Sequence, residues 1–188
     1  TEYIPFASVD DTCRDISVTC IAPTKTFNLA GLQTAAVYAE NSILHHRMWR
    51  QLNTDEVAEP NAFAIQATIA AFQYGEEWLD ELREYVEKNK QYVTEFLQEK
   101  IPLIHPVAGD ATYIMWLDCR KITESGRQFV KFIRKTSGLY VSGGNQYGRG
   151  GEGFLRVNVA TSKLVVEDGM QRLYESVDAW LKEEKISK

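Results

Sequence analysis

An alternating apolar segment that ends at a proline, followed at once by a lysine, is the feature that most constrains how this chain folds. Residues 16–22 alternate apolar and polar side chains, which predicts a strand, and Pro23 ends that strand. Lys25 is therefore expected to project from a strand end and not from a helix. Burial favours the neutral form of an amine, which is the nucleophile that condenses with an aldehyde. Without further signals, a lone lysine here is an ordinary solvated residue.

The residues around Lys25 supply such a signal. The run TKTFNLAGLQ at residues 24–33 closely resembles the cofactor-lysine segment of fold-type I pyridoxal-phosphate (PLP) enzymes. The resemblance is strongest to the MalY/PatB group of cystathionine β-lyases (C–S lyases) and to related aminotransferases. The runs EVAEPNAFA at 56–64 and GEGFLRVNVA at 151–160 resemble downstream segments of the same group, in the same order. Because the polypeptide of this family is much longer, the resemblance implies that the chain is its C-terminal half.

The resemblance implies an α/β fold, namely the C-terminal part of a fold-type I PLP-dependent transferase. Residues 1–75 would form the end of the large PLP-binding domain, which carries the cofactor lysine. Residues 76–100 would form the linker helix, and residues 101–188 the small α+β domain. The apolar stripe of residues 76–100 recurs at helical spacing, as a linker helix requires.

Local patterns predict the remaining elements. Period-2 alternation, helical spacing and cap residues give the assignments. The predicted strands cover residues 16–22, 33–39, 111–118, 139–142 and 154–159, and the predicted helices start at Asn41, cover 62–73 and 76–100, run from the cap Thr123 to Gly138, and cover 164–182. The last two helices are expected to cover a small antiparallel or mixed sheet.

Arg156 is the second candidate site residue. It lies between Leu155 and Val157 in a predicted strand, and a partly buried guanidinium is costly without a partner. That partner is either a carboxylate of the protein, in a structural salt bridge, or the carboxylate of a substrate, whose geometry the planar fork matches.

The family assigns roles to these residues. By resemblance, Lys25 binds PLP as a Schiff base and moves the α-proton, Thr24 contacts the cofactor phosphate, and Arg156 binds the α-carboxylate of a small amino-acid substrate. Ala22 stands where related enzymes often place a hydroxyl, and Gln33 stands about where many aminotransferases carry a phosphate-binding arginine. These departures favour the lyase group and leave the phosphate contacts open.

A glycine-rich loop precedes the strand that carries Arg156. Residues 143–153 contain six glycines in eleven positions, without the spacing of a nucleotide-binding motif. The loop is interpreted as a mobile flap from which Tyr147 or Arg149 reaches the substrate, with an ordinary flexible surface loop as the alternative.

Composition excludes several classes of function. The 188 residues include 21 basic and 26 acidic side chains in no long block, which argues against nucleic-acid and membrane partners. No apolar run approaches the roughly 20 residues of a membrane helix, and no signal pattern opens the chain, so a cytoplasmic location is expected. The three cysteines form no CxxC pair, and no metal-ligand spacing occurs. The resemblance implies a homodimer.

Three hypotheses on function follow. The first is a PLP-dependent C–S lyase, the second an aminotransferase of the same fold, and the third a fragment that binds a ligand or partner without turnover. In the resembled family, the aromatic residue that stacks on the cofactor ring, the aspartate at the pyridine nitrogen and most phosphate contacts precede this part of the chain. The 188 residues alone are therefore expected to be catalytically inert.

Overall fold

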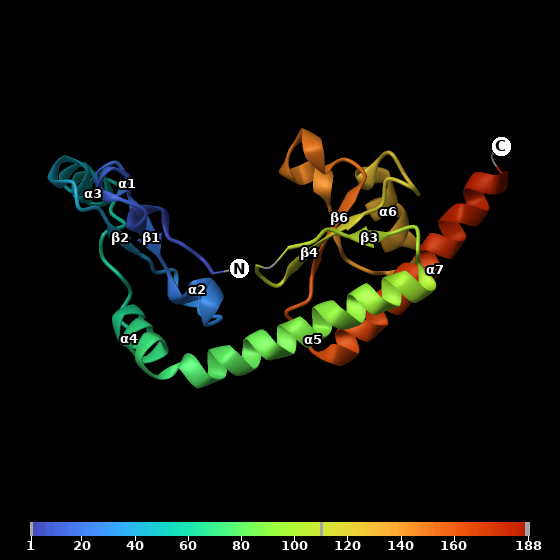
Figure 1. Cartoon of the computed structure of the whole chain (residues 1–188), viewed down its shortest axis with the longest axis horizontal. Helices are drawn as coiled ribbons and strands as arrows, with labels where there is room; N and C mark the ends of the chain where they lie inside the picture. The colour runs from blue at the N-terminus through green and yellow to red at the C-terminus, as the bar shows by residue number, and fades with distance from the viewer. Residues whose placement is uncertain (1, 110, 187–188) are drawn as a thin grey trace. The chain divides into compact units, whose positions relative to one another are not determined.

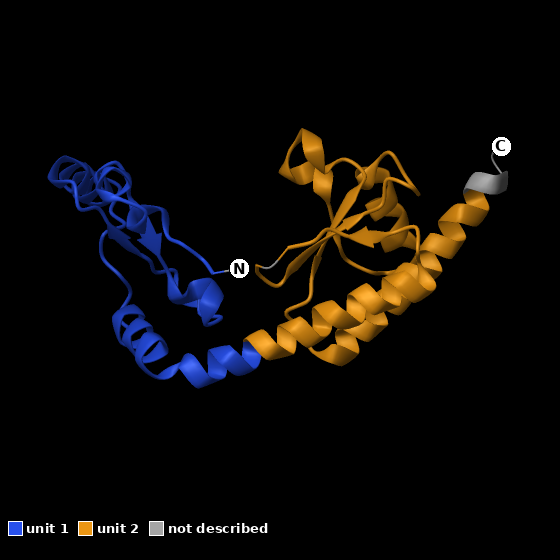
Figure 2. Ribbon diagram, in the orientation of Figure 1, with its two compact units in different colours: residues 1–82 blue, residues 83–188 orange. Residues whose placement is uncertain are grey.

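The structure is a computed structural model that describes residues 2–109 and 111–186 (Figure 1). The chain divides into two compact units, Thr1–Leu82 and Arg83–Lys188, which are described one at a time (Figure 2). Helix α5 (Glu76–Lys100) begins in unit 1 and ends in unit 2.

Unit 1 consists of short helical segments around two short strands. Its elements are η1 (Phe6–Ser8), α1 (Asp11–Asp15), β1 (Thr19–Ile21), α2 (Pro23–Thr26), η2 (Ala30–Leu32), β2 (Ala36–Tyr38), α3 (Ser42–Thr54) and α4 (Ala64–Tyr74), followed by the first part of α5.

The two strands of unit 1 are shorter than the sequence predicts. β1 and β2 pair antiparallel, with Cys20 opposite Val37, and each spans three residues where seven were expected. Ile16 and Val18 lie outside β1 and are exposed, and β2 is not the buried strand that its apolar composition predicted. In this chain a single partner strand supports each of them, and isolated two-stranded pairs are marginal.

Two helix starts in unit 1 test the cap predictions. Asn41 caps α3 as predicted, because its Oδ1 accepts hydrogen bonds from the amides of Ile43 and Leu44 at 3.0 and 3.1 Å. Helix α4 begins at Ala64, two residues later than predicted, because Asn61 caps a turn that precedes the helix.

Unit 2 is built on an antiparallel sheet. The strand order is β3-β4-β6-β5, and the predicted strand over 139–142 is replaced by a shorter and later β5. The elements are β3 (His105–Pro106), β4 (Ile114–Asp118), α6 (Gly126–Ser137), β5 (Ser142–Gly143), η3 (Gly144–Tyr147), η4 (Arg149–Gly151), β6 (Phe154–Asn158) and α7 (Lys163–Ile186). The part of α5 that belongs to unit 2 runs beside α7 (Figure 1), where the Tyr85 hydroxyl accepts a hydrogen bond from the Lys163 amide at 2.8 Å.

The hydrophobic core lies entirely in unit 2. It draws on one side each of α5, α6 and α7 and on the central strands β4 and β6. Its fully buried members are Val93, Leu97, Ile104, Leu117, Cys119, Phe129, Ile133, Leu155, Val159 and Leu173. Burial of such side chains is the main favourable term in folding, so this unit holds most of the chain's stability.

Helix α6 begins and ends at defined caps. Ser125, not the predicted Thr123, is the N-cap, because its hydroxyl accepts a hydrogen bond from the Gln128 amide. Thr123 instead caps the turn before it, through a hydrogen bond from the Ser125 amide. Gly138 ends the helix at a φ of 72°, as predicted, because glycine adopts this left-handed conformation without steric cost.

The glycine-rich loop forms a pair of packed 3-10 turns, η3 and η4, and its interpretation as a mobile flap stays a prediction. The backbones of Gly144 and Gly151 lie so close that a Cβ on either residue would collide with the carbonyl of the other. A Cβ at Gly144 would also meet the ring of Trp116. Glycines here permit close packing of two turns against the sheet.

Unit 1 has almost no interior of its own. Among its described hydrophobic residues only Ala39 and Ala64 are buried, together with Pro23. Large apolar side chains remain exposed over its strands and over α4, including Ile21, Tyr38, Phe63, Ile65 and Phe72. Contiguous exposed apolar surface marks a place where other protein packs.

Among the helices that the structure describes, none has a stretch long and apolar enough to cross a membrane.

Candidate cofactor and carboxylate sites

Lys25 and Thr24 lie together on α2, a single helical turn directly after β1. The prediction that Lys25 projects from a strand end is wrong in this detail. Pro23 ends the strand, but its fixed φ also suits the first position of a helix, and its missing N–H costs nothing there. One residue thus stops the strand and starts the turn that carries the lysine.

The turn around Lys25 is fixed by backbone hydrogen bonds and by one aromatic anchor. The amide of Leu29 donates to the carbonyl of Thr24 at 3.0 Å, and Asn28 adopts a φ of 54°. The ring of Phe27 meets Phe72 edge-on at 5.3 Å and lies 6.3 Å from Trp78. Phe27 therefore attaches α2 to α4 and to the start of α5.

The amine of Lys25 is exposed and carries no hydrogen bond or ion pair within residues 2–109 and 111–186. A cavity of about 540 Å³ lies in the same unit, lined by residues such as Pro23, Gln33, Asn61 and Phe72, but neither Lys25 nor Thr24 lines it. The chain therefore presents the lysine without enclosing it.

Arg156 lies in the middle of β6, opposite Trp116 on β4 and Ser142 on β5. Its neighbours Leu155 and Val157 point into the core, so Arg156 lies on the other face of the sheet, half-buried. On this face the ring of Trp116 meets the rings of Tyr147 and Phe154 edge-on.

No carboxylate pairs with Arg156 in the part of the chain that the structure describes. The structural salt bridge that was the alternative reading is therefore absent from these residues. The guanidinium remains able to bind a carboxylate from outside, in the bidentate geometry that arginine favours.

The strand of Arg156 is anchored to α5 by a buried amide. Asn89 is 2% exposed, and its Nδ2 donates to the carbonyls of Val159 and Thr161 at 2.9 and 3.0 Å. This contact joins residues about 70 positions apart in the chain, and sequence reasoning placed Asn89 in no role. Nothing in its local pattern distinguishes it from a solvated helix residue.

One acidic residue of the sheet that carries Arg156 is already paired. Asp118, at the end of β4, accepts hydrogen bonds from the Arg120 guanidinium at 2.6 and 2.9 Å. The Arg120 side chain lowers the pKa of Asp118 to about 2, so this carboxylate stays ionised near neutral pH and is a poor proton donor.

The structure thus brings Lys25 together with Thr24 in unit 1 and places Arg156 in unit 2. Trp116 was not among the predicted site residues. It lies opposite Arg156 because β4 pairs with β6 in this register. The only local signal for Trp116 in the sequence was the period-2 alternation of residues 114–118, which predicts a strand.

The profile of the family "Aminotransferase class I and II" matches residues 6–173. The chain belongs to this family. Cystathionine beta-lyase PatB from Bacillus subtilis is 38% identical over 172 residues, which are 92% of this chain and 44% of PatB. The chain therefore spans less than half the length of this relative.

Two solved structures have the same fold. The PLP-bound C–S lyase from Staphylococcus hominis superposes with a TM-score of 0.83 at 28% identity, over 94% of this chain and 43% of that one. Cystalysin from Treponema denticola, which contains PLP, superposes with a TM-score of 0.91 at 24% identity, over 95% of this chain and 45% of that one. The chain therefore has the fold of part of a fold-type I PLP enzyme, as its sequence predicted.

PLP is the cofactor of this family, and part of what it requires is present in unit 1. The amine of Lys25 suits the cofactor aldehyde, and the hydroxyl of Thr24 is a hydrogen-bond donor of the kind that phosphate accepts. The Lys25 amine is exposed, and neither Lys25 nor Thr24 lines the cavity of this unit. The chain therefore fits the covalent attachment of PLP better than its complete enclosure.

Proposed function

We propose that the protein to which this chain belongs is a PLP-dependent C–S lyase, which forms a thiol, pyruvate and ammonia from cystathionine or cysteine conjugates. The observation that carries the proposal is the 38% identity to Cystathionine beta-lyase PatB across 92% of the chain. Arg156, with no carboxylate partner among the described residues, supports an amino-acid substrate.

Each of the two site residues has a defined task in this reaction. When bound, PLP supplies the electron sink that weakens the bonds to the substrate α-carbon. Arg156 holds the α-carboxylate through two parallel N–H···O hydrogen bonds and so orients the α-carbon. The Nζ of Lys25 accepts the α-proton. The bond between the β-carbon and sulfur then breaks, the sulfur leaves with the electron pair and gains a proton, and water supplies the ketone oxygen of pyruvate as ammonia departs.

An aminotransferase is the second candidate, because the family that matches residues 6–173 is named for that reaction. Arg156 would hold the carboxylate in the same way, and the Nζ of Lys25 would move the α-proton without a β-elimination afterwards. Products separate the two functions. Pyruvate and free thiol from cystathionine support the lyase, whereas amino transfer that requires a keto acid supports the aminotransferase.

The proposal also holds that the 188 residues are inert alone. Exposed apolar side chains over β1, β2 and α4 support it, since unit 1 lacks the interior that would enclose a cofactor. A small amino acid as substrate, a homodimer and a cytoplasmic location belong to the same proposal. Light scattering on the active protein measures the oligomeric state.

The test compares the chain alone with a fusion to the part of PatB that this chain does not match. Both proteins are supplied with PLP and cystathionine, and pyruvate and thiol are measured. We expect turnover from the fusion only. The Lys25→Ala fusion should be inactive, and Lys88→Ala, on an exposed lysine paired with Glu84, should keep full activity. Turnover by the chain alone would overturn its inertness, and a fusion that requires a keto acid would overturn the lyase assignment.

A further inference from the structure

One side of α6 carries four cationic side chains beside a cavity in unit 2. The cavity has a volume of about 540 Å³ and adjoins η3. Its cationic lining residues are Arg127, Lys131, Arg134 and Lys135, and no acidic residue lines it. Arg127 lies four residues before Lys131, and Arg134 and Lys135 lie three and four residues after it, so these side chains share one face of the helix. Phe129 and Ile133 face the core.

The stability of α6 does not explain this arrangement. Like charges four residues apart on a helix repel one another, as Arg127 and Lys131 do. Arg127 also lies in the first turn, where the helix dipole disfavours a cation and where no acidic residue is present. Only Arg134 and Lys135, in the last turn, complement the dipole. None of the four forms an ion pair within residues 2–109 and 111–186.

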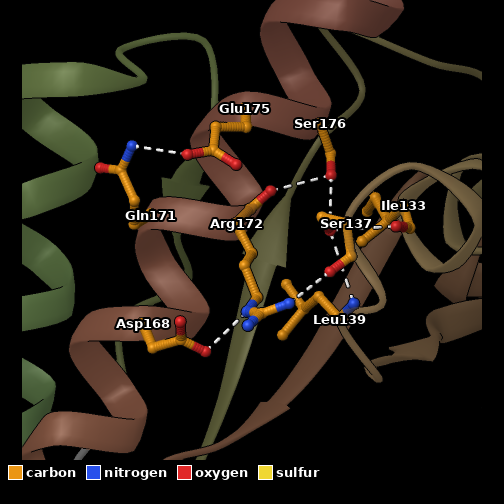
Figure 3. A network of polar contacts seen from close by, with 8 residues as sticks. All are labelled: Ile133, Ser137, Leu139, Asp168, Gln171, Arg172, Glu175 and Ser176. Atoms are coloured by element: carbon orange, nitrogen blue, oxygen red, sulfur yellow. Dashed lines mark hydrogen bonds and ion pairs between the residues drawn. The ribbon is translucent and has the colours of Figure 1, made fainter.

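The helix that presents these cations is firmly held on its other side. The Arg172 guanidinium on α7 donates to the carbonyl of Ser137 at 2.6 Å, and the Ser176 hydroxyl donates to the Ser137 hydroxyl at 2.9 Å (Figure 3). Outside the core, the guanidinium carbon of Arg134 lies 3.8 Å from the centre of the Tyr140 ring. The cations are therefore presented from a rigid element, which favours binding because little order is lost.

Asn145 supplies a second and independent signal in the same cavity. Its Oδ1 is buried and accepts no hydrogen bond from any described residue. Buried acceptors without a donor are rare in folded proteins, and each calls for an explanation. Asn145 itself is only partly buried and lines the cavity, so a turn of its side chain would bring Oδ1 to a ligand that carries a hydroxyl or amino group beside its negative charges.

We infer that this cavity binds a small molecule with a chain of phosphates and nearby hydroxyl or amino donors, of the nucleoside di- or triphosphate class. Guanidinium groups bind phosphate oxygens in bidentate geometry, and ammonium groups add point charges. The nine residues from Arg127 to Lys135 span about 12 Å along the helix, so their charges suit a chain of phosphates better than a single one. The positive charge that would bind the phosphates comes from the side chains of α6. The neighbouring glycine-rich loop lacks the spacing of a phosphate-binding loop. The inference uses neither Lys25 nor Arg156.

Calorimetric titration of the 188-residue chain with magnesium-free ATP and with tripolyphosphate tests it. Both ligands should bind at one site per chain, more weakly as salt is added, with ATP the tighter. The double variant Arg127→Gln/Lys131→Gln should weaken both ligands at least tenfold. The matched control Lys88→Gln/Lys182→Gln removes two charges that are paired with Glu84 and Asp178 outside the cavity and should leave both affinities unchanged. All four positions are exposed, and circular dichroism verifies that each variant is folded.

Asn145→Ala separates the two parts of the inference. It should weaken ATP severalfold and leave tripolyphosphate unchanged, because only ATP carries donors for Oδ1. Absence of saturable binding, or an equal loss in the control variant, overturns the site. Equal affinities for ATP and tripolyphosphate overturn the nucleoside part.

Discussion

The guanidinium carbon of Arg156 lies 5.4 Å from the centre of the Tyr147 ring, which itself meets Trp116 edge-on at 5.5 Å. Aromatic faces attract guanidinium groups, so Tyr147 covers and orients one side of the arginine. The other side is left without a carboxylate among the described residues. The guanidinium of Arg156 is thus held against Tyr147 and has no carboxylate partner within residues 2–109 and 111–186.

Replacement of Arg156 by lysine in the fusion with PatB keeps the charge but removes both the planar fork and its stacking on Tyr147. Binding of α-carboxylate substrates should weaken by about 1.5–3 kcal/mol, the scale of a hydrogen bond to a charged group. That loss is roughly tenfold or more in kcat/KM. Arg127→Lys, a change of the same kind on exposed α6, should leave the kinetics as they were. Equal kinetics in Arg156→Lys would indicate that Arg156 is structural.

Lys25→Ala removes the covalent attachment point of PLP. In the fusion protein, borohydride reduction followed by peptide mapping should place the modified lysine at Lys25, and Lys25→Ala should lose both the adduct and the visible absorbance of the bound cofactor. Lys131→Ala and Lys135→Ala are the controls, because these two lysines of α6 also attract phosphate groups. Both variants should keep the adduct at Lys25. An adduct on another lysine would contradict the assignment.

Local signals in the sequence predicted the helices better than the strands. Asn41 and Gly138 cap helices as predicted because a cap depends on a few neighbouring residues. The segments 16–22 and 33–39 formed strands of only three residues, because a strand is defined by neighbours that a sequence does not show.

The same distinction holds for the two site residues. The segment around Lys25 is continuous in the chain, so its motif could be recognised. The contact of Tyr147 with Arg156 and the place of Trp116 opposite Arg156 depend on the packing of η3 and on the register of β4 against β6, and no local pattern records either. For this reason the sequence indicated Arg156 alone, whereas the structure places Tyr147 against its guanidinium and Trp116 opposite it on β4.

Asn89→Ala should destabilise unit 2. The change removes the buried amide that donates to the carbonyls of Val159 and Thr161. The loss should lower the free energy of unfolding by about 1–3 kcal/mol. Urea unfolding followed by tryptophan fluorescence measures the loss as a lower midpoint. Gln171→Ala, which removes an exposed hydrogen bond to Glu175, should leave the midpoint within error. An unchanged midpoint in Asn89→Ala would show that water replaces the amide.

Cys119 should be inert toward thiol reagents in the folded chain. It is fully buried, and burial raises its pKa to about 12, whereas Cys20 is exposed. An unfolded thiol titrates near about 8.5, so the stability that Cys119 contributes is present below that pH and declines as pH rises toward 12. Labelling with a chromogenic disulfide should modify Cys20 rapidly and Cys119 only in denaturant. Labelling of both at one rate would show that the core opens.

The part of the chain that folds alone should begin within α5 and not at its end. The resemblance implied a small domain over residues 101–188, but Val93 and Leu97 of α5 are fully buried in the core of unit 2. Loss of each buried aliphatic side chain costs roughly 1.5–3 kcal/mol, against a total stability of about 5–15 kcal/mol for a domain. Residues 83–188 should therefore melt in one cooperative transition by circular dichroism, while residues 101–188 should show a broad transition and bind hydrophobic dye. Residues 83–188 with Leu97→Ala should melt at an intermediate temperature, because one side chain is lost and Asn89 still holds β6. Identical cooperative melting of the two fragments would mean that α5 contributes nothing to this core.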